Sequence, residues 1–482
     1  MIRTKIVATL GPATKDEATL KKLIKTGVSV FRLNFSHGNH DEHFENIRII
    51  RKVSKELSVP VAILQDLSGP KIRIGKVEKP FPVHQGEFIE FFFRPVECGK
   101  EKNRALLWVD HPEVLKTLKE GDLIFIADGS IRSQVIEKTS EKLIARVLLG
   151  GIISSRKGVN FPGVKLPIPC LTEKDKKDLA FGIKHGVDFI SLSFVNHADD
   201  VAECKALIKE LGGDQPLFAK IETQSGVEHI DEILELADGV MIARGDLGVE
   251  VPIEKVPVIQ KNIIKKARNL GKPVIVATQM LTSMINSLMP SRADVSDIAN
   301  AVLDGADALM LSDETTIGKY PLEAVEVMKK TIEEAEKIYP FLQGVGEPVL
   351  QDEAISHSCA ILAKEVEADR IVVFTRSGIS ACRVSKFRPN VPILAAVHEE
   401  KILRKLTIVW GVVPAAIVTE TKNPEKMLKD FLRMALDKGL ISSKDILVVT
   451  MGSQIGKVGS TNMIRLVRME EEVATLYPSS DS

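Results

Sequence analysis

Residues 216–248 read PLFAKIETQSGVEHIDEILELADGVMIARGDLG and contain the repeating unit of the fold. Two short runs rich in aliphatic residues, 216–221 and 239–242, are separated by a stretch with the spacing of an amphipathic helix. Each run leads into charged residues. A strand, a helix and a second strand in this order predict two parallel strands joined by a helical crossover.

The same alternation recurs along most of the chain. Strand-like runs fall at 5–10, 30–34, 61–66, 189–192, 216–221, 239–242, 273–277 and 308–311, and a last helical pattern follows at 322–339. Eight such units, spread over 1–69 and 170–340, predict an α/β fold with a closed (β/α)8 barrel of the TIM type. An open, doubly wound parallel sheet fits the same alternation, and composition does not decide between the two.

Residues 70–169 interrupt this alternation. They contain glycine-rich turns and short alternating runs such as 88–93 and 143–149, which predict a small β-barrel domain inserted in the third β–α loop. Insertions at that end of a barrel often act as lids. From 345 to 482 strands and helices alternate again, which predicts a separate C-terminal α/β domain.

The composition is typical of a multidomain cytoplasmic protein. The chain has 482 residues, and its 65 Lys and Arg residues balance 65 Asp and Glu residues. Proteins that hold nucleic acid by its backbone charge are usually basic, so we expect no nucleic-acid partner. No apolar run approaches the roughly 20 residues of a membrane span, and we expect no membrane partner. The five scattered cysteines lack a C-x-x-C motif, which indicates reduced thiols rather than disulfides or a zinc site.

Polar residues gather where the predicted barrel strands end. Six strand ends carry them, at 32–38, 66, 220–222, 243–248, 278–279 and 312–314. In a barrel of parallel strands all of these positions face one mouth, where the active sites of this fold lie. The convergence of six strand ends indicates a site more strongly than any single motif does.

Glu222 and Asp246 follow adjacent strands and are the candidate metal ligands. Two carboxylates completed by water and substrate oxygens suit Mg²⁺, although salt bridges to neighbouring cations are the alternative. Lys220 shares a strand face with Glu222, where it could stabilise a transferring anion or simply reach the surface. Arg32 and Arg73 could clamp phosphate oxygens or form surface ion pairs. These residues predict a Mg²⁺-dependent barrel enzyme for a small, phosphorylated substrate and do not name its reaction.

Two further features of the mouth suit an anion. Backbone N–H groups of the glycine-flanked turn 243–248 could bind a carboxylate, especially if a helix begins there, although most such turns are structural. Thr278 and Ser312 place hydroxyl groups at strand ends, where hydroxyls as often cap helices.

Together these residues resemble the pyruvate kinase family along nearly the whole chain. The resemblance is carried by 4–14 (TKIVATLGPAT), 31–38 (FRLNFSHG), 156–163 (RKGVNFPG), 220–222 (KIE), 238–250 (DGVMIARGDLGVE), 277–284 (ATQMLTSM) and 300–310 (NAVLDGADALM). It implies a barrel, an inserted β lid and a C-terminal α/β domain, commonly assembled as a homotetramer. It also implies a glycolytic reaction in which phosphoenolpyruvate and ADP give pyruvate and ATP with Mg²⁺ or Mn²⁺.

The resemblance assigns roles to the residues of the barrel mouth. Glu222 and Asp246 would bind the divalent metal, and Lys220 would stabilise the charge on the transferring phosphoryl group. The backbone at Gly245 and Asp246, together with Thr278, would hold the substrate carboxylate.

The resemblance also implies contacts to the phosphates and a route for the proton. Arg32 would contact phosphate, and the nucleotide side would be lined by Asn34, His37, Arg73 and, from the lid, Lys157. The second half-reaction protonates the enolate of pyruvate. Thr278, Ser312 and Glu314 match the polar corner near that carbon, and we expect a relayed water there rather than a single side-chain acid. Asp313 stands where the family usually has Gly.

A second departure concerns the family's potassium site, whose oxygens match Asn34, Ser36, Asp66 and the carbonyl of Leu67. Potassium-dependent members carry Thr at the position of Leu67 and Glu at that of Lys71. An ammonium at Lys71 could supply the positive charge that K⁺ otherwise provides. The hypothesis is that activity requires Mg²⁺ but little or no K⁺; the alternative is that Lys71 is a solvated hinge lysine.

In the C-terminal domain, residues 375–380 (TRSGIS) follow a strand and open a helix, as in a phosphate-binding cradle. They resemble the family's effector loop, and 452–462 resembles the loop that faces it. The candidate effector residues are Thr375, Arg376, Ser377, Gly378 and Ser380. They predict allosteric control by a phosphorylated metabolite; an unused strand-to-helix turn is the alternative.

Two other classes of protein fit part of the pattern. A metal-dependent lyase or aldolase that forms an enolate would use a similar carboxylate pair, but it would not explain Lys220, Lys157 and Arg73. A metabolite sensor that kept the fold would be expected to have lost Lys220 or a metal carboxylate, and all of these are present.

Overall fold

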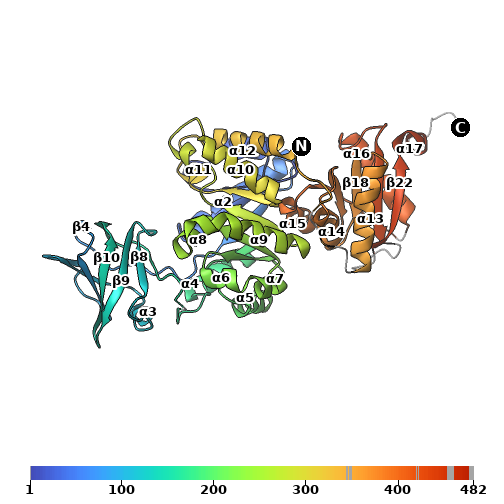
Figure 1. Ribbon diagram of the computed structural model, residues 1–482. Helices are drawn as coiled ribbons and strands as arrows, with labels where there is room; N and C mark the ends of the chain where they lie inside the picture. The colour runs from blue at the N-terminus through green and yellow to red at the C-terminus, as the bar shows by residue number, and fades with distance from the viewer. Residues whose placement is uncertain are drawn as a thin grey trace.

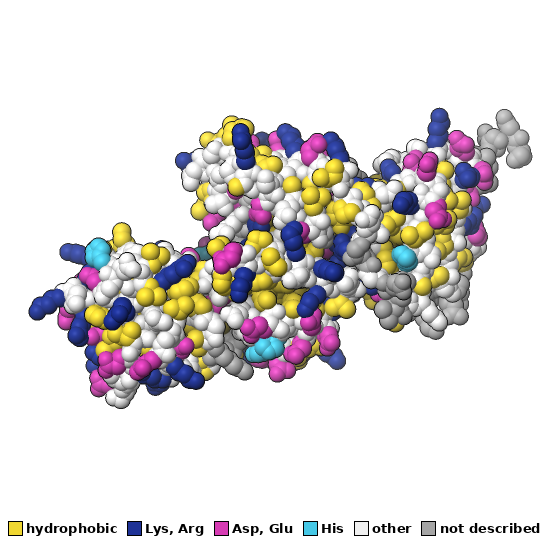
Figure 2. All heavy atoms as spheres, in the orientation of Figure 1, with side chains coloured by type: hydrophobic (Ala, Val, Ile, Leu, Met, Phe, Trp, Pro, Cys, Tyr) yellow, Lys and Arg dark blue, Asp and Glu magenta, His cyan; other side chains and the backbone are white. Residues whose placement is uncertain are grey.

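The computed structural model describes residues 2–164, 166–343, 346, 350–419, 421, 423–452 and 461–476. Three parts follow one another in space, with a β-rich part at one end, a barrel in the middle and an α/β part at the other end (Figure 1). Basic and acidic side chains are interspersed over the face shown in Figure 2. Among the described helices, none combines the length and the apolar character that crossing a membrane would demand.

Eight parallel strands close into a barrel in the order β1-β17-β16-β15-β14-β13-β3-β2. They are β1 (Lys5–Thr9), β2 (Val28–Asn34), β3 (Ala62–Asp66), β13 (Phe189–Leu192), β14 (Leu217–Ile221), β15 (Gly239–Ala243), β16 (Val274–Ala277) and β17 (Ala308–Leu311). Strands buried on both faces need continuous apolar runs, which is why they were recognisable in the sequence. The closed barrel confirms the predicted fold and excludes the open sheet.

Helices cover the outside of the barrel. They are α1 (Glu17–Thr26), α2 (His40–Leu57), α4 (Glu173–Lys184), α5 (Ala198–Glu210), α7 (Ile230–Leu236), α9 (Val256–Asn269), α10 (Arg292–Asp304) and α12 (Pro321–Glu336). Shorter helices are α6 (Gln224–Glu228), α8 (Arg244–Glu250), α11 (Asp313–Thr316), and the 3₁₀ turns η1 (Ile253–Lys255) and η2 (Thr282–Ile285). Local caps fix where they begin: Thr172 and Ser291 each close a capping box at α4 and α10.

Aspartates fix the edge of the sheets opposite the mouth. Each of these aspartates directly precedes a strand. Its backbone N–H donates to the neighbouring strand, and its Oδ2 accepts an N–H from that strand. They are Asp188, Asp238, Asp307 and, in the C-terminal part, Asp369. The carboxylate thus extends the ladder and holds its register. Asp307 also accepts from Arg388 Nη1 at 3.1 Å and from the Trp410 N–H at 3.2 Å, which ties the barrel floor to the C-terminal part.

The inserted segment folds as a curled sheet in the order β12-β8-β9-β10-β5-β7-β6, with a two-stranded sheet β11-β4 beside it. Its elements are β4 (Phe81–Val83), β5 (Phe88–Phe92), β6 (Gly99–Glu101), β7 (Arg104–Trp108), α3 (Pro112–Leu115), β8 (Leu123–Ile126), β9 (Ile131–Lys138), β10 (Lys142–Leu149), β11 (Gly151–Ile153) and β12 (Val159–Asn160). A separate apolar core that includes Ile89, Phe91 and Leu107 stabilises it. The predicted inserted β lid is confirmed.

The C-terminal part is a five-stranded sheet in the order β20-β19-β18-β21-β22, with helices on its faces (Figure 1). Its strands are β18 (Arg370–Phe374), β19 (Ile393–Val397), β20 (Val412–Ile417), β21 (Ile446–Gly452) and β22 (Thr461–Arg468). Its helices are α13 (Gln351–Glu365), α14 (Ile379–Lys386), α15 (Glu400–Lys405), η3 (Leu406–Ile408), α16 (Pro424–Asp437) and α17 (Met469–Leu476). The predicted C-terminal α/β domain is confirmed.

Candidate active site

A buried cluster of two cations and two carboxylates lies at the barrel mouth. Lys220 Nζ is 3.0 Å from Glu222 Oε1, 3.2 Å from Asp66 Oδ1 and 2.7 Å from Ser193 Oγ. Arg32 donates to Asp66 Oδ2 through Nε at 2.8 Å and through Nη2 at 2.6 Å. The structure therefore brings four of the predicted site residues together. Arg32 lies in β2, Asp66 in β3 and Lys220 in β14, and Glu222 directly follows β14.

Burial and charge shift the pKa values in this cluster. Burial disfavours the ammonium of Lys220, but the carboxylates of Asp66 and Glu222 outweigh it and raise the pKa of that lysine. Burial also disfavours the carboxylate of Asp66, yet Lys220 and Arg32 hold its pKa below the usual range. Burial raises the pKa of Glu222, and the Asp246 carboxylate adds to the rise against the opposing effect of Lys220. Lys220 thus remains a cation at neutral pH. The carboxyl groups of Glu222 and Asp246, by contrast, disfavour each other's negative charge.

The oxygen donors of Glu222 and Asp246 fit a divalent cation. Glu222 directly follows β14, and Asp246 lies in α8, which follows β15; the two strands pair directly, with Ile221 opposite Ile242. Glu222 Oε2 accepts the Phe194 N–H at 2.8 Å, which fixes the orientation of the carboxylate. Mg²⁺ is usually held by one or two carboxylates and completes its shell with water and substrate oxygens. No set of three or more His, Cys, Asp or Glu side chains suited to a metal occurs in the described part of the chain.

Helix α8 begins at Arg244, directly after β15, as the turn at 243–248 suggested. The Gly245 N–H donates to Thr278 Oγ1 at 2.8 Å. A Cβ at position 245 would lie 3.3 Å from the same oxygen, so glycine allows this close approach. Gly245 and Thr278, which the resemblance assigns to the substrate carboxylate, are therefore in contact.

Glu314 joins two loops of the mouth. Its Oε1 accepts the Leu281 N–H at 3.0 Å and its Oε2 accepts the Ser312 N–H at 2.8 Å. The Ser312 hydroxyl is buried and has no hydrogen-bond partner among the described residues, so it keeps free capacity to bind a water. The side chain of Asp313, where the family usually has Gly, is exposed and does not crowd this corner.

The residues predicted for the nucleotide side form two pairs. Asn34 ends β2 and its Oδ1 accepts the Ser36 N–H at 3.1 Å, whereas His37 belongs to the turn that follows and its side chain is exposed. Arg73 and Lys157 lie on neighbouring segments of the lid; Arg73 Nη1 donates to the Arg156 carbonyl at 3.2 Å, and the Lys157 side chain is exposed. One pair sits on the barrel and the other on the lid.

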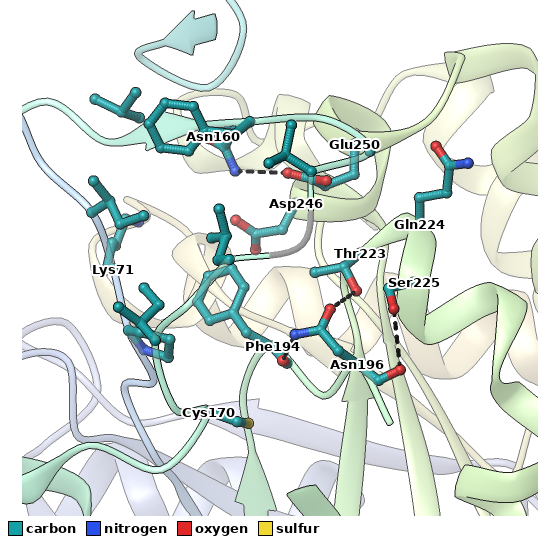
Figure 3. Close-up of a pocket in the computed structure, with 18 of the residues that line it drawn as sticks. Lys71, Asn160, Cys170, Phe194, Asn196, Thr223, Gln224, Ser225, Asp246 and Glu250 are labelled. Carbon is teal, nitrogen blue, oxygen red and sulfur yellow. Dashed lines mark hydrogen bonds between the residues drawn. The ribbon is translucent and has the colours of Figure 1, made fainter. Parts of the chain in front are cut away.

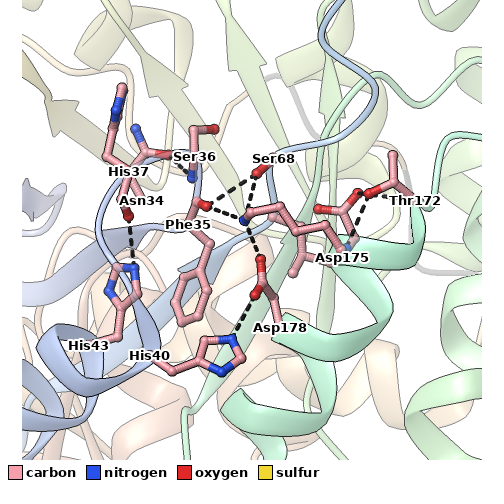
Figure 4. A network of polar contacts seen from close by, with 12 residues as sticks. Asn34, Phe35, Ser36, His37, His40, His43, Ser68, Thr172, Asp175 and Asp178 are labelled. Carbon is pink, nitrogen blue, oxygen red and sulfur yellow. Dashed lines mark hydrogen bonds and ion pairs between the residues drawn. The ribbon is translucent and has the colours of Figure 1, made fainter.

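A polar network that the sequence did not indicate supports the turn after β2 (Figure 4). Lys174 of α4 donates through Nζ to the Phe35 carbonyl at 2.6 Å, to Ser68 Oγ at 3.2 Å and to Asp178 Oδ2 at 2.6 Å. His40 Nε2 lies 2.7 Å from Asp178 Oδ1. Phe35 and Ser68 flank residues predicted for the monovalent-cation site, so this network holds both of its segments.

A cavity of about 410 Å³ separates the lid from the barrel beside Asp246 (Figure 3). Asn160 of the lid lies 3.4 Å from Glu250 Oε1 of α8 through its Nδ2. Burial raises the pKa of Glu250 to about 7. Lys71 lines this cavity with an exposed side chain, and within the described residues no hydrogen bond or ion pair joins it to the predicted potassium-site residues.

Ser193 is the main site residue that the sequence reasoning missed. Its Oγ accepts from Lys220 Nζ and donates to the Leu67 carbonyl, each at 2.7 Å. A chain of hydrogen bonds thus links Lys220 to an oxygen predicted for the potassium site. The signal was available, because Ser193 directly follows the fourth strand of the barrel, as Thr9 ends the first and accepts from Arg32 Nη1 at 3.2 Å.

The predicted effector loop lies at the start of α14. Thr375 Oγ1 accepts the Gly378 N–H at 3.0 Å, and Gly378 takes a left-handed conformation with φ of +90°. Ser380 Oγ lies 2.6 Å from Thr461 Oγ1 of β22, while Arg376 and Ser377 are exposed. Most of the facing loop at 452–462 lies outside the described residues.

Known proteins resemble this chain along nearly its whole length. The family described as pyruvate kinase, barrel domain, matches residues 1–325, and the pyruvate kinase alpha/beta domain matches 353–467. Pyruvate kinase 2 of Synechocystis sp. is 44% identical over 471 residues, which are 96% of this chain and 79% of that protein. The pyruvate kinase of Thermotoga maritima is 41% identical, over 98% of this chain and 100% of that protein. The crystal structure of a pyruvate kinase from Cryptosporidium parvum superposes with a TM-score of 0.90 at 36% identity and covers 97% of this chain and 96% of that one. The chain belongs to the pyruvate kinase family of phosphotransferases.

Proposed function

We propose that this chain transfers the phosphoryl group of phosphoenolpyruvate to ADP, with a divalent cation held by Glu222 and Asp246. The buried cluster around Lys220, at the mouth of a barrel from a phosphotransferase family, carries the proposal. The test is ATP formation from phosphoenolpyruvate and ADP with Mg²⁺, in buffer without K⁺ and then with K⁺ added. Absence of turnover under both conditions would contradict it.

The charges of the cluster suit phosphoryl transfer. Lys220 is fixed by Asp66, Glu222 and Ser193, so its ammonium needs little reorganisation when negative charge develops on a transferring group. Arg32 donates to Asp66 through Nη2 and to Thr9 Oγ1 through Nη1. These bonds hold its guanidinium in the same cluster as Lys220. The divalent cation, when bound, neutralises charge on the phosphate and carboxylate oxygens.

The second step is protonation of the enolate of pyruvate. Glu314 accepts two backbone N–H groups and so fixes the position of Ser312. The Ser312 hydroxyl has both donor and acceptor capacity free among the described residues, as a relay through a bound water requires. Thr278, in contact with Gly245, completes the corner.

The lid would bring Arg73 and Lys157 to the nucleotide phosphates, opposite Asn34 and His37 of the barrel. Closure would also exclude water, which protects the phosphoryl donor from hydrolysis. A lyase or a sensor would not need these lid cations. A homotetramer in the cytoplasm also remains a prediction, which light scattering of the purified protein can test for assembly.

Independence from K⁺ is proposed for Lys71. Lys71 is two residues after Gly69, which has φ of +64°, and its side chain is exposed. Lys71→Glu is expected to lower activity without K⁺ about tenfold, and added K⁺ should restore it, because one favourable charge interaction is replaced by a cation site. Initial rates over a K⁺ titration measure this. Lys79→Glu, the same charge change at an exposed lid position, is the control. A K⁺ response identical to that of the unmodified protein would refute the proposal.

Control by a phosphorylated metabolite is proposed for the loop 375–380. The support is the left-handed Gly378 before α14 and the hydroxyls of Thr375 and Ser380 beside it. A sugar phosphate is expected to lower the KM for phosphoenolpyruvate. Ser380→Asp should abolish the effect through charge repulsion, whereas Ser443→Asp, an exposed position of the same domain, should not. Equal activation of both variants would count against the loop.

A further inference from the structure

One buried arginine forms hydrogen bonds to a strained turn of the barrel mouth, residues 278–279. Arg244 is 8% exposed, and its Nη2 donates to the carbonyl oxygens of Thr278 at 2.9 Å and Gln279 at 3.2 Å. The same guanidinium pairs with Asp297, through Nη1 to Oδ1 and through Nη2 to Oδ2, each at 2.7 Å. The side chain therefore connects α8, the loop after β16 and α10.

The 278–279 turn has unfavourable backbone dihedral angles. Thr278 has φ of +68° and Gln279 has φ of +57°. Side-chain-bearing residues seldom adopt this left-handed region, and two in succession persist only where their surroundings hold them. The side chain of Gln279 is exposed, so it is not held in place by burial in the core. The two hydrogen bonds from Arg244 are the contacts that reach both carbonyl groups.

The turn decides where the Thr278 hydroxyl lies. Thr278 Oγ1 accepts the N–H of Gly245, the residue next to Arg244 in the chain. Arg244 thus fixes both partners of this contact: Gly245 through the helix that it begins, and Thr278 through its carbonyl oxygen.

We propose that Arg244 is a positioning residue that holds the 278–279 turn in its left-handed conformation and so sets the Thr278 hydroxyl against Gly245. The inference rests on the role proposed above for Thr278 in holding the substrate carboxylate. Arginine suits the task because its planar fork donates in several directions at once while the charge stays paired with Asp297.

Arg244→Lys tests the proposal with the charge retained. An ammonium can pair with Asp297, but it cannot also span both carbonyl groups. We expect kcat for ATP formation to fall about tenfold or more, because a small misplacement of a substrate-holding group has this effect. The KM for ADP should stay unchanged, since Asn34 and His37 lie on another loop. Asp297→Asn is the control for the ion pair alone and should cost less activity.

A second substitution asks whether the backbone is the cause. Glycine adopts left-handed conformations freely, so Gln279→Gly in the Arg244→Lys protein should recover about threefold or more of the lost rate. Gln279→Gly alone sets the reference. An arginine that only stabilised the fold through Asp297 would not be rescued in this way, and thermal unfolding of each variant separates the two effects.

The outcomes are distinct. If Thr278→Ala leaves turnover unchanged, the role proposed for Thr278 fails and the inference falls with it. If Thr278→Ala lowers turnover but Arg244→Lys does not, or if glycine at 279 recovers nothing, the inference alone is overturned. In the Thr278→Ala protein, Arg244→Lys should add less than about a twofold loss, because the two residues act through one contact.

Discussion

Replacing Lys220 by methionine is expected to lower the rate of ATP formation by about a thousandfold, since a preorganised charge at a transferring group contributes on this scale. Methionine keeps the length of the side chain and suits burial, so the loss would come from the charge. Asp66 would keep Arg32 as its partner, and Glu222 would keep the Phe194 N–H. Coupled detection of ATP measures the rate, and circular dichroism shows that the variant is folded.

A second reaction separates the role of Lys220 from general damage. Exchange of the methyl protons of pyruvate in D₂O, followed by NMR, reports on the enolate, and under the proposed function it would depend on Ser312 and Glu314. It should survive in Lys220→Met. Lys205→Met is the matched control, because Lys205 also pairs with an aspartate, Asp238 at 2.8 Å, but at the surface. A loss of less than tenfold in ATP formation would rule out the role proposed for Lys220.

Replacing Glu222 by glutamine is expected to weaken binding of a divalent cation about a hundredfold or more, because even residues that only support metal ligands contribute 10–100-fold. Glutamine retains an oxygen for the Phe194 N–H, so the local shape is preserved. Titration with Mn²⁺ in the absence of substrates, followed by electron paramagnetic resonance, measures the affinity without any reference to turnover.

The neighbouring cavity offers a matched control for this change. Glu250 lines the same space as Asp246, and burial raises its pKa to about 7, so the carboxyl is only partly ionised at neutral pH. Glu250→Gln should therefore change Mn²⁺ binding little. If both variants bound Mn²⁺ equally weakly, diffuse negative charge rather than the Glu222 and Asp246 pair would be responsible.

The barrel could be predicted from the sequence because strand and helix periodicity is local. The run around Leu217–Ile221 is apolar since both of its faces are buried, whatever its neighbours are. The polar ends of the strands could be placed at one mouth because the carboxyl ends of all strands in a parallel barrel lie on the same side. Which of them touch could not be predicted, because the contact between Lys220 and Asp66 spans 154 residues and depends on how the barrel closes.

Contacts that depend on unusual backbone conformations could not be predicted from the sequence. Neither Thr278 nor Gln279 favours a left-handed conformation, so nothing in the letters showed that Arg244 would reach their carbonyl groups. Lys71 lines the cavity beneath the lid, and the replacement of K⁺ by its ammonium stays a prediction.

The carboxylate of Asp307 gives β17 a mechanical property. One end of this strand is fastened to Arg388 and Trp410, and the other end leads directly into Ser312. The four residues between them form a stiff rod of about 13 Å, with no loop to absorb a displacement. A displacement of Asp307 by the C-terminal part would therefore be expected to shift Ser312, and a ligand bound to the Ser312 hydroxyl would in turn favour one position of Asp307 by the same coupling free energy.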